Sequence, residues 1–138
     1  MSSYRINSGF VGAFGERCLR YKDELAAYLR REGYNVEVLN DAIRVLHDTL
    51  PLYLNVEFKE RYVYLGVGHE EELRSILEDL KDAGEDVEEI VESALSFLSM
   101  AALKARRWLE ERGFIVIFKL REGTVEVYDM LEEILEEE

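Results

Sequence analysis

Four charged residues in the first half of the chain have types and a spacing that could support chemistry. Glu57 and Lys59 stand two positions apart in the run 56–59, and two further acids, Glu24 and Asp41, precede them. The run alternates apolar and polar residues and is expected to be a strand. Because residues two apart on a strand point to the same face, the carboxylate of Glu57 and the amine of Lys59 would share one surface.

An acid followed by Glu-x-Lys on a strand resembles the metal-dependent nuclease superfamily known by its PD-(D/E)xK motif, over about residues 16 to 60. The resemblance implies a Mg²⁺ or Mn²⁺ ion held by Asp41 and Glu57, with Lys59 polarising the attacking water or the scissile phosphate. Glu24 would belong to the same catalytic set. Polar residues at every second position also mark the outer face of any solvated strand, so both interpretations stay open.

The histidines and the cysteine suggest structural roles. His47 and His69 lie 22 residues apart, and neither has another ligand at metal-binding spacing on its own helix face, so no zinc site is predicted. The single cysteine, Cys18, excludes an internal disulfide and fits the apolar stripe of a helix better than it fits a nucleophile. The glycine-rich residues 8–15 lack the spacing of a phosphate-binding loop, so residues 1–15 are expected to be a flexible lead-in.

Length and composition favour one acidic domain. The chain of 138 residues is 48% hydrophobic, enough for a substantial core in a single domain spanning residues 1–138. The formal net charge of −13 repels phosphate backbones, which disfavours nucleic acid as a partner, and attracts basic proteins. Residues 69–92 carry eleven acids against Arg74 and Lys81, and this negative face is expected to be solvated surface or a binding surface for a partner.

The expected location is the cytoplasm. The N-terminus lacks a signal-peptide pattern, and no apolar run reaches the length of a membrane span. A single cysteine suits a reducing compartment. The charged composition without glutamine is compatible with a thermophilic source.

Hydrophobic periodicity predicts an α+β fold in the order α-β-β-β-β-α-α-β-β-α. We expect an antiparallel sheet of five to six strands with its helices mainly on one face. Helical steps mark residues 16–32, 73–83, 86–112 and 129–135, and alternation marks strands at 34–38, 43–45, 52–58, 62–67, 114–120 and 124–128.

Two segments share a helix–glycine–strand pattern. Residues 28–36 match residues 108–116 in the order aromatic, leucine, three charged residues, glycine and aromatic. Gly33 and Gly113 are expected to take the left-handed conformation that ends a helix, so that the next aromatic enters the core. Convergence on a common unit and a true duplication would both give this pattern.

The rest of the chain is organised around the long helix expected at residues 86–112. Between Ala94 and Leu103 the apolar residues occur nearly all round this helix, which requires burial on more than one side. Either the chain itself or a second copy must cover this segment. A symmetric homodimer is the commonest oligomer and is the favoured alternative.

The order of elements, with its acidic terminal helix, resembles the type III secretion chaperone fold and its non-secretion relatives. Members of that class are typically homodimers that bind protein segments and lack catalysis. The resemblance implies a dimer or partner surface formed by Leu95, Phe97, Met100 and Leu103. We therefore expect a non-enzymatic protein-binding or dimeric accessory module without a cofactor, whose partner is a second copy or a basic or amphipathic protein segment. The metal-dependent nuclease is the alternative.

Overall fold

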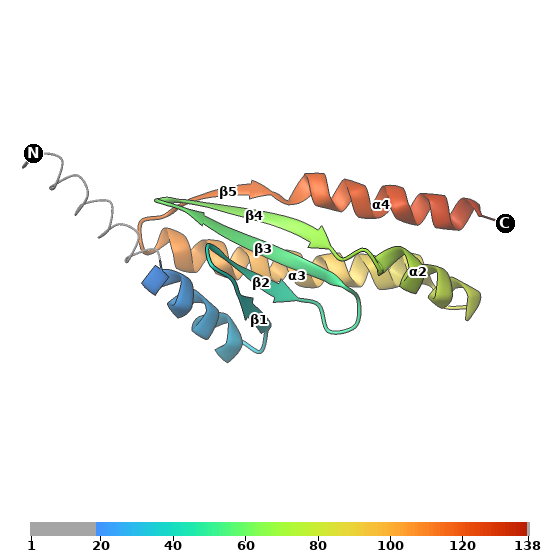
Figure 1. Ribbon diagram of the computed structural model, residues 1–138, viewed down its shortest axis with the longest axis horizontal. Coiled ribbons are helices and arrows are strands. Elements are labelled where there is room, and N and C mark those ends of the chain that lie inside the picture. The colour runs from blue at the N-terminus through green and yellow to red at the C-terminus, as the bar shows by residue number, and fades with distance from the viewer. Residues whose placement is uncertain (1–18, 138) are drawn as a thin grey trace, which may run out of the picture.

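The computed structural model describes residues 19–137 and shows an α+β fold (Figure 1). The described chain begins in a helix that continues to residue 31, called here the first helix. The other elements are β1 (Asn35–Val38), β2 (Ala42–Leu46), β3 (Leu52–Lys59), β4 (Tyr62–His69), α2 (Leu73–Asp82), α3 (Val87–Glu110), β5 (Ile115–Lys119) and α4 (Leu120–Glu136). Within residues 19–137, no helix combines the length and the apolar character that a membrane span requires.

The five strands form one sheet in the order β1-β2-β3-β4-β5. Neighbouring strands from β1 to β4 pair antiparallel, which confirms the antiparallel pairing predicted for this part of the sheet. Strand β5 pairs parallel to β4, so the sheet is mixed and mostly antiparallel, where the sequence predicted only antiparallel pairs. The parallel pair is possible because α2 and α3 together return the chain to the starting end of β4, which is the long crossover that parallel strands need.

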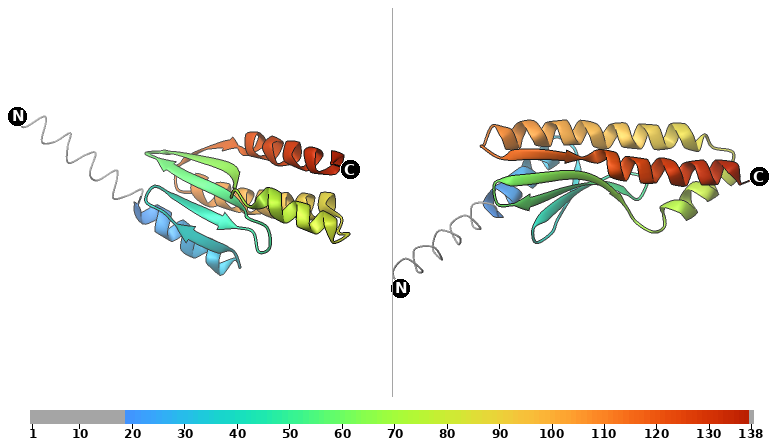
Figure 2. Two further views of the ribbon diagram at one scale, coloured as in Figure 1. Left: turned by 45° about the vertical axis from the view of Figure 1, so that its right-hand side comes forward. Right: turned by 90° about the horizontal axis from the view of Figure 1, so that it is seen from above.

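One face of the sheet is buried, and no helix of residues 19–137 covers the other. Along β3 the even-numbered residues 52–58 are buried and the odd-numbered residues 53–57 are half-buried, which confirms the predicted alternation. Figures 1 and 2 show α3 running behind the sheet, on the buried side. Leu25 of the first helix and Leu98 of α3 are fully buried in the same hydrophobic cluster as the strands. The face that carries Tyr53 and Glu57 is called the open face below.

The predicted helix ends are confirmed at both repeated segments. Gly33 and Gly113 have positive φ angles of 97° and 88°, which only glycine adopts without strain. In each case the residue after the glycine donates its N–H to the carbonyl of a leucine five positions earlier, at 3.0 Å for Tyr34 and 3.1 Å for Phe114. This is the hydrogen-bond pattern of a Schellman turn, and it directs the following aromatic side chain toward the core.

The strand predicted at residues 124–128 is wrong, because these residues are helical. Helix α4 begins at Leu120, directly after β5 and with no loop between them. Its buried residues are Gly123, Val127, Leu131 and Ile134, at the steps of one helix face. A Cβ atom on Gly123 would lie 2.0 Å from the carbonyl oxygen of Val67, so this glycine allows the helix to approach β4 and does not form a turn.

Candidate protein-binding surface

Glu57 and Lys59 lie together on the open face, as their spacing predicts. The Lys59 Nζ is 3.6 Å from the Glu57 Oε1, and the same amine is 5.4 Å from the centre of the Tyr64 ring on β4. The Lys59 side chain is largely exposed. The pair is therefore an exposed ion pair on a strand, a type of contact that contributes about 0–1 kcal/mol.

The structure does not join the other two acids of the nuclease pattern to this pair. Asp41 lies in the turn between β1 and β2, where its carbonyl oxygen accepts a hydrogen bond from the Phe58 N–H at 2.8 Å. Phe58 points into the core and Glu57 to the open face, so this contact does not bring the two carboxylates together. Glu24 is exposed on the first helix and pairs with Arg20 at 4.0 Å.

No metal site is assembled from the residues that the structure describes. Within residues 19–137, no group of three or more His, Cys, Asp or Glu side chains lies close enough to hold an ion. His69 Nε2 lies 3.8 Å from the Glu126 carboxylate across β4 and α4. Cys18 and the glycine-rich residues 8–15 lie outside the described residues.

His47 holds the turn between β2 and β3. Its Nδ1 accepts the backbone N–H of Leu50 at 3.0 Å and that of Thr49 at 3.3 Å. Its ring meets the Phe97 ring edge-on, with 5.4 Å between the centroids. Burial lowers the pKa of His47, against the opposite effect of the Asp48 charge. A neutral imidazole fits this position, because only an unprotonated Nδ1 can accept these bonds.

Lys22 is a buried cation that is not among the predicted site residues. It is 5% exposed, and its Nζ donates to the carbonyl oxygens of Leu39 and Asn40 at 2.5 and 2.7 Å. These bonds fix the turn between β1 and β2 to the first helix. The spacing could have revealed it, because Lys22 stands four residues after Cys18 and three before Leu25, on the apolar stripe of the helix.

The four residues predicted as a partner surface divide into two pairs. Leu95 is 7% exposed in the core, and Phe97 is half-buried against the ring of Tyr34, with 5.3 Å between centroids. Met100 and Leu103 are 55% and 53% exposed. Between residues 94 and 103, the chain therefore covers one side of α3 with its own residues. Within the described part of the molecule, Met100 and Leu103 stay uncovered.

Strand β5 lies beside α3, on the side from which Leu103 projects, and forms an apolar edge of the sheet. Ile115 is 44% exposed and Phe118 is 39% exposed. The Arg106 guanidinium of α3 lies 5.3 Å from the centre of the Phe118 ring, which ties the outer side of α3 to the strand. Met100, Leu103 and strand β5 are together called the β5–α3 surface. This edge could not be foreseen from the sequence, because the alternating residues 124–128 predicted a further strand next to β5.

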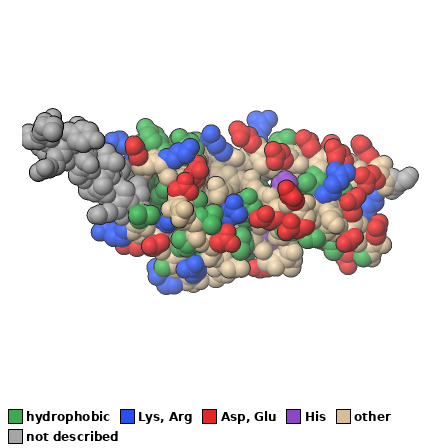
Figure 3. Space-filling model, in the orientation of Figure 1, with side chains coloured by type: hydrophobic (Ala, Val, Ile, Leu, Met, Phe, Trp, Pro, Cys, Tyr) green, Lys and Arg blue, Asp and Glu red, His purple; other side chains and the backbone are tan. Residues whose placement is uncertain are grey.

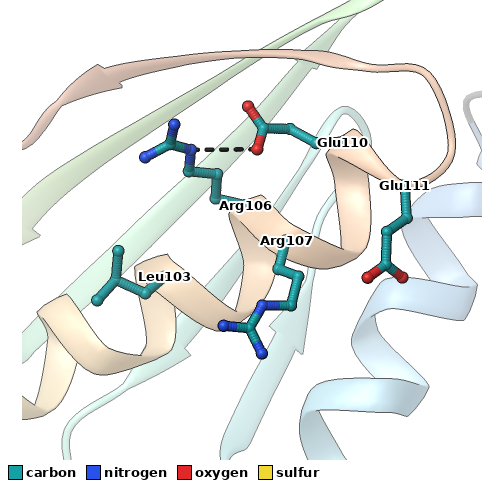
Figure 4. A pocket seen from close by; sticks show the side chains of 5 residues that line it. All are labelled: Leu103, Arg106, Arg107, Glu110 and Glu111. Carbon is teal, nitrogen blue, oxygen red and sulfur yellow. Dashed lines mark hydrogen bonds and ion pairs between the residues drawn. The ribbon is translucent and has the colours of Figure 1, made fainter.

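Two hollows adjoin the β5–α3 surface. Figure 4 shows that Leu103, Arg106 and Glu110 project from the side of α3 that faces β5, while Arg107 and Glu111 project from the other side. The hollow along this helix end measures about 520 Å³. The second, about 530 Å³, lies between α3 and α4 and is lined by Glu92, Leu95, Ser96, Ser99, Met100, Thr124 and Tyr128.

The opposite edge of the sheet is protected. The first helix lies along β1 (Figure 1), and the Arg30 guanidinium donates a hydrogen bond of 2.8 Å to the Val36 carbonyl oxygen. Strand β1 also carries the charged Glu37 among its four residues. Charged side chains and covering helices are the usual devices that prevent an edge strand from pairing with another chain. Strand β5 carries four apolar residues and one lysine.

Acidic side chains gather at the end of the molecule formed by α2 and the C-terminal half of α4 (Figure 3). Residues 70–92 hold eleven acidic and two basic residues, and residues 126–137 hold six acidic and no basic ones. The two bases fasten the helices together. Arg74 donates to the Glu133 and Glu137 carboxylates at 2.6 and 2.8 Å, and Lys81 donates to the Ile134 and Glu137 carbonyl oxygens at 2.7 and 2.8 Å. The hydrogen bond from Arg74 lowers the pKa of Glu137.

Comparison of the chain with protein-family models, with curated proteins and with solved structures gives no match.

Proposed function

We propose that the protein is a non-enzymatic accessory module that binds protein chains through the β5–α3 surface. The observation that carries the proposal is the edge of β5, an apolar strand that the described residues leave unpaired on one side. An extended segment of another chain can pair with such an edge through backbone hydrogen bonds, while side-chain contacts beside it give specificity.

The exposed side chains next to the strand supply the apolar contribution. Full burial of a Leu, Met or Phe side chain is worth about 1.5–3 kcal/mol. Met100, Leu103 and Phe118 are each 39–55% exposed, so covering them would contribute roughly 1 kcal/mol apiece. The Arg106 guanidinium and the hollows on either side add polar groups at the rim, which is the common composition of a protein interface.

The charge distribution favours partners that are not acidic. The acidic end formed by α2 and α4 attracts a basic segment and repels an acidic one over about 8–10 Å at physiological salt. A second copy would avoid this repulsion only if its own acidic end lay away from the first. The β5–α3 surface itself carries both signs, with Lys119, Arg106 and Glu110 around its apolar centre.

Site-specific photo-crosslinking in cells tests the proposal. A photoreactive amino acid would replace Leu103, and in a matched control it would replace Leu135, which is 40% exposed on α4 near the acidic end. We expect protein adducts at Leu103, identified by mass spectrometry, that are absent at Leu135. Equal background labelling at the two positions would contradict a binding role for this surface.

A further inference from the structure

We infer that the edge of β5 pairs with the same edge of a second copy, in antiparallel register about Ile117, to give a continuous ten-stranded sheet. The inference rests on the proposed protein-binding role of the β5–α3 surface and names its partner. It follows from which backbone groups face outward, from the sequence of the strand and from the difference between the two sheet edges.

The outward-facing groups are set by the pairing of β5 with β4. The Ile115 N–H donates to the Arg61 carbonyl at 2.9 Å, so the backbone of residue 115 faces inward. Hydrogen-bonding direction alternates along a strand, so residues 117 and 119 also face β4. The N–H and C=O groups of Val116 and Phe118 then face the free edge and have no partner in the sheet of residues 19–137.

Only a few registers let two copies satisfy these groups. In an antiparallel pair, outward-facing residues must stand opposite outward-facing residues. A two-fold axis centred on Ile117 places Val116 of each copy opposite Phe118 of the other. All five residues of the strand then overlap with the strand of the second copy. Each Val116–Phe118 pair exchanges two hydrogen bonds, so four are formed. Lys119 stands opposite Ile115 of the second copy, so no like charges face each other.

The side-chain layers agree with this register. Val116 and Phe118 are opposite Val63 and Leu65 of β4, which are fully buried, so they lie on the face that α3 covers. Joining the sheets at β5 places both α3 helices on the same side of the joined sheet, and Leu103 of each copy projects from the side of α3 that faces β5. A five-residue strand pair alone is short for a stable interface, and the exposed side of α3 supplies the additional area.

The two edges of the sheet also explain why assembly would stop at two. Pairing through β5 is isologous, because the same surface is used by both copies, and it leaves only the β1 edges at the ends of the joined sheet. The first helix and the Arg30 hydrogen bond protect these edges. The assembly is therefore a closed dimer.

Disulfide trapping tests the register. Cysteine would replace Ile117, or in the control Ile115 on the same strand and face, both with Cys18→Ser. Across the axis, the Cα atoms of two residues 117 would be about 4.5 Å apart, which a disulfide can span. Two residues 115 would be roughly 13 Å apart and could not be bridged. We expect a disulfide-linked dimer for Ile117→Cys and none for Ile115→Cys. Equal cross-linking of both, or of neither, would overturn the register.

A proline substitution provides a second readout that leaves the monomer fold intact. The Val116 N–H faces the free edge, so Val116→Pro removes no bond to β4, and proline is tolerated at such edge positions. Light scattering across a range of concentrations should show a dimer in the parent and about tenfold weaker dimerisation in Val116→Pro, with an unchanged circular dichroism spectrum. A parent that stays monomeric at every concentration would refute the dimer. Adducts of Leu103 with a different protein would still support the proposed function.

Discussion

Replacement of Gly123 by alanine tests the placement of α4 against the sheet. In an unobstructed helix interior, Gly→Ala stabilises by about 1 kcal/mol. Here the added Cβ would lie 2.0 Å from the oxygen and 2.8 Å from the carbon of the Val67 carbonyl. Both atoms belong to the backbone of β4, so the helix must move outward and loosen the packing of Val127 and Leu131. Such overpacking costs about 1–3 kcal/mol, and contact with backbone atoms places this case at the upper end of that range. Subtracting the gain of about 1 kcal/mol in helix propensity, we expect the free energy of unfolding to decrease by about 2 kcal/mol.

Urea and thermal unfolding followed by circular dichroism would measure this loss. About 2 kcal/mol in a chain of this length corresponds to a melting temperature roughly 8 °C lower. The matched control is Gly66→Ala on β4, where the added Cβ meets only the Lys119 carbonyl oxygen at 3.7 Å and stability should change by less than about 0.5 kcal/mol. A Gly123→Ala variant as stable as the parent, or a control destabilised equally, would refute the reasoning.

Three further predictions concern single side chains. Lys22→Met leaves two turn carbonyls without their buried donor and should lower the free energy of unfolding by about 1–3 kcal/mol in urea titrations, whereas Arg31→Met, at an exposed position of the same helix, should change it little. Burial lowers the pKa of His47 below its usual value, so the unfolded chain binds the proton before the folded chain does as the pH falls. The stability that neutral His47 provides is therefore complete above about pH 6.5 and decreases below it. When the pH is lowered from about 7.5 to 5.5, the urea midpoint should therefore decrease more in the parent than in His47→Asn. The control variant His69→Asn should behave like the parent. With Mg²⁺ or Mn²⁺ and duplex or branched DNA we expect no cleavage, and cleavage that Glu57→Ala abolishes would establish the nuclease alternative and overturn the proposed function.

The parts of the fold that depend on local patterns could be predicted from the sequence. Alternation along β3, the Asp86 cap that accepts the Glu89 N–H at 3.2 Å and the glycine stops at residues 33 and 113 all arise from residues close together in the chain. The parallel pairing of β5 and the helical state of residues 124–128 depend on contacts between distant segments, above all that of Gly123 with Val67. Without that contact, a glycine followed by alternating valines resembles a turn and a strand.

The candidate surface shows the same division. Apolar residues all round α3 predicted burial on more than one side, but within residues 19–137 the chain covers one side of this helix, and the sequence could not show which residues the sheet covers. Met100 and Leu103 remain exposed, whereas Leu95 lies in the core. The free edge of β5 could not be predicted, because a further strand was expected beside it at residues 124–128. Lys22 was overlooked because a lysine on an apolar stripe is ordinarily assumed to reach solvent.

The absence of a loop between β5 and α4 couples the two elements. Lys119 ends the strand and Leu120 begins the helix, so no spare residue can absorb a displacement of either element. Sliding β5 by one residue along β4 would have to rotate α4 by about 100° or unwind its first turn, and that rotation would carry Val127 and Leu131 out of the core. A protein that binds the edge of β5 would therefore also restrict the movement of α4. In return, a substitution that destabilises α4 should weaken binding at the β5 edge.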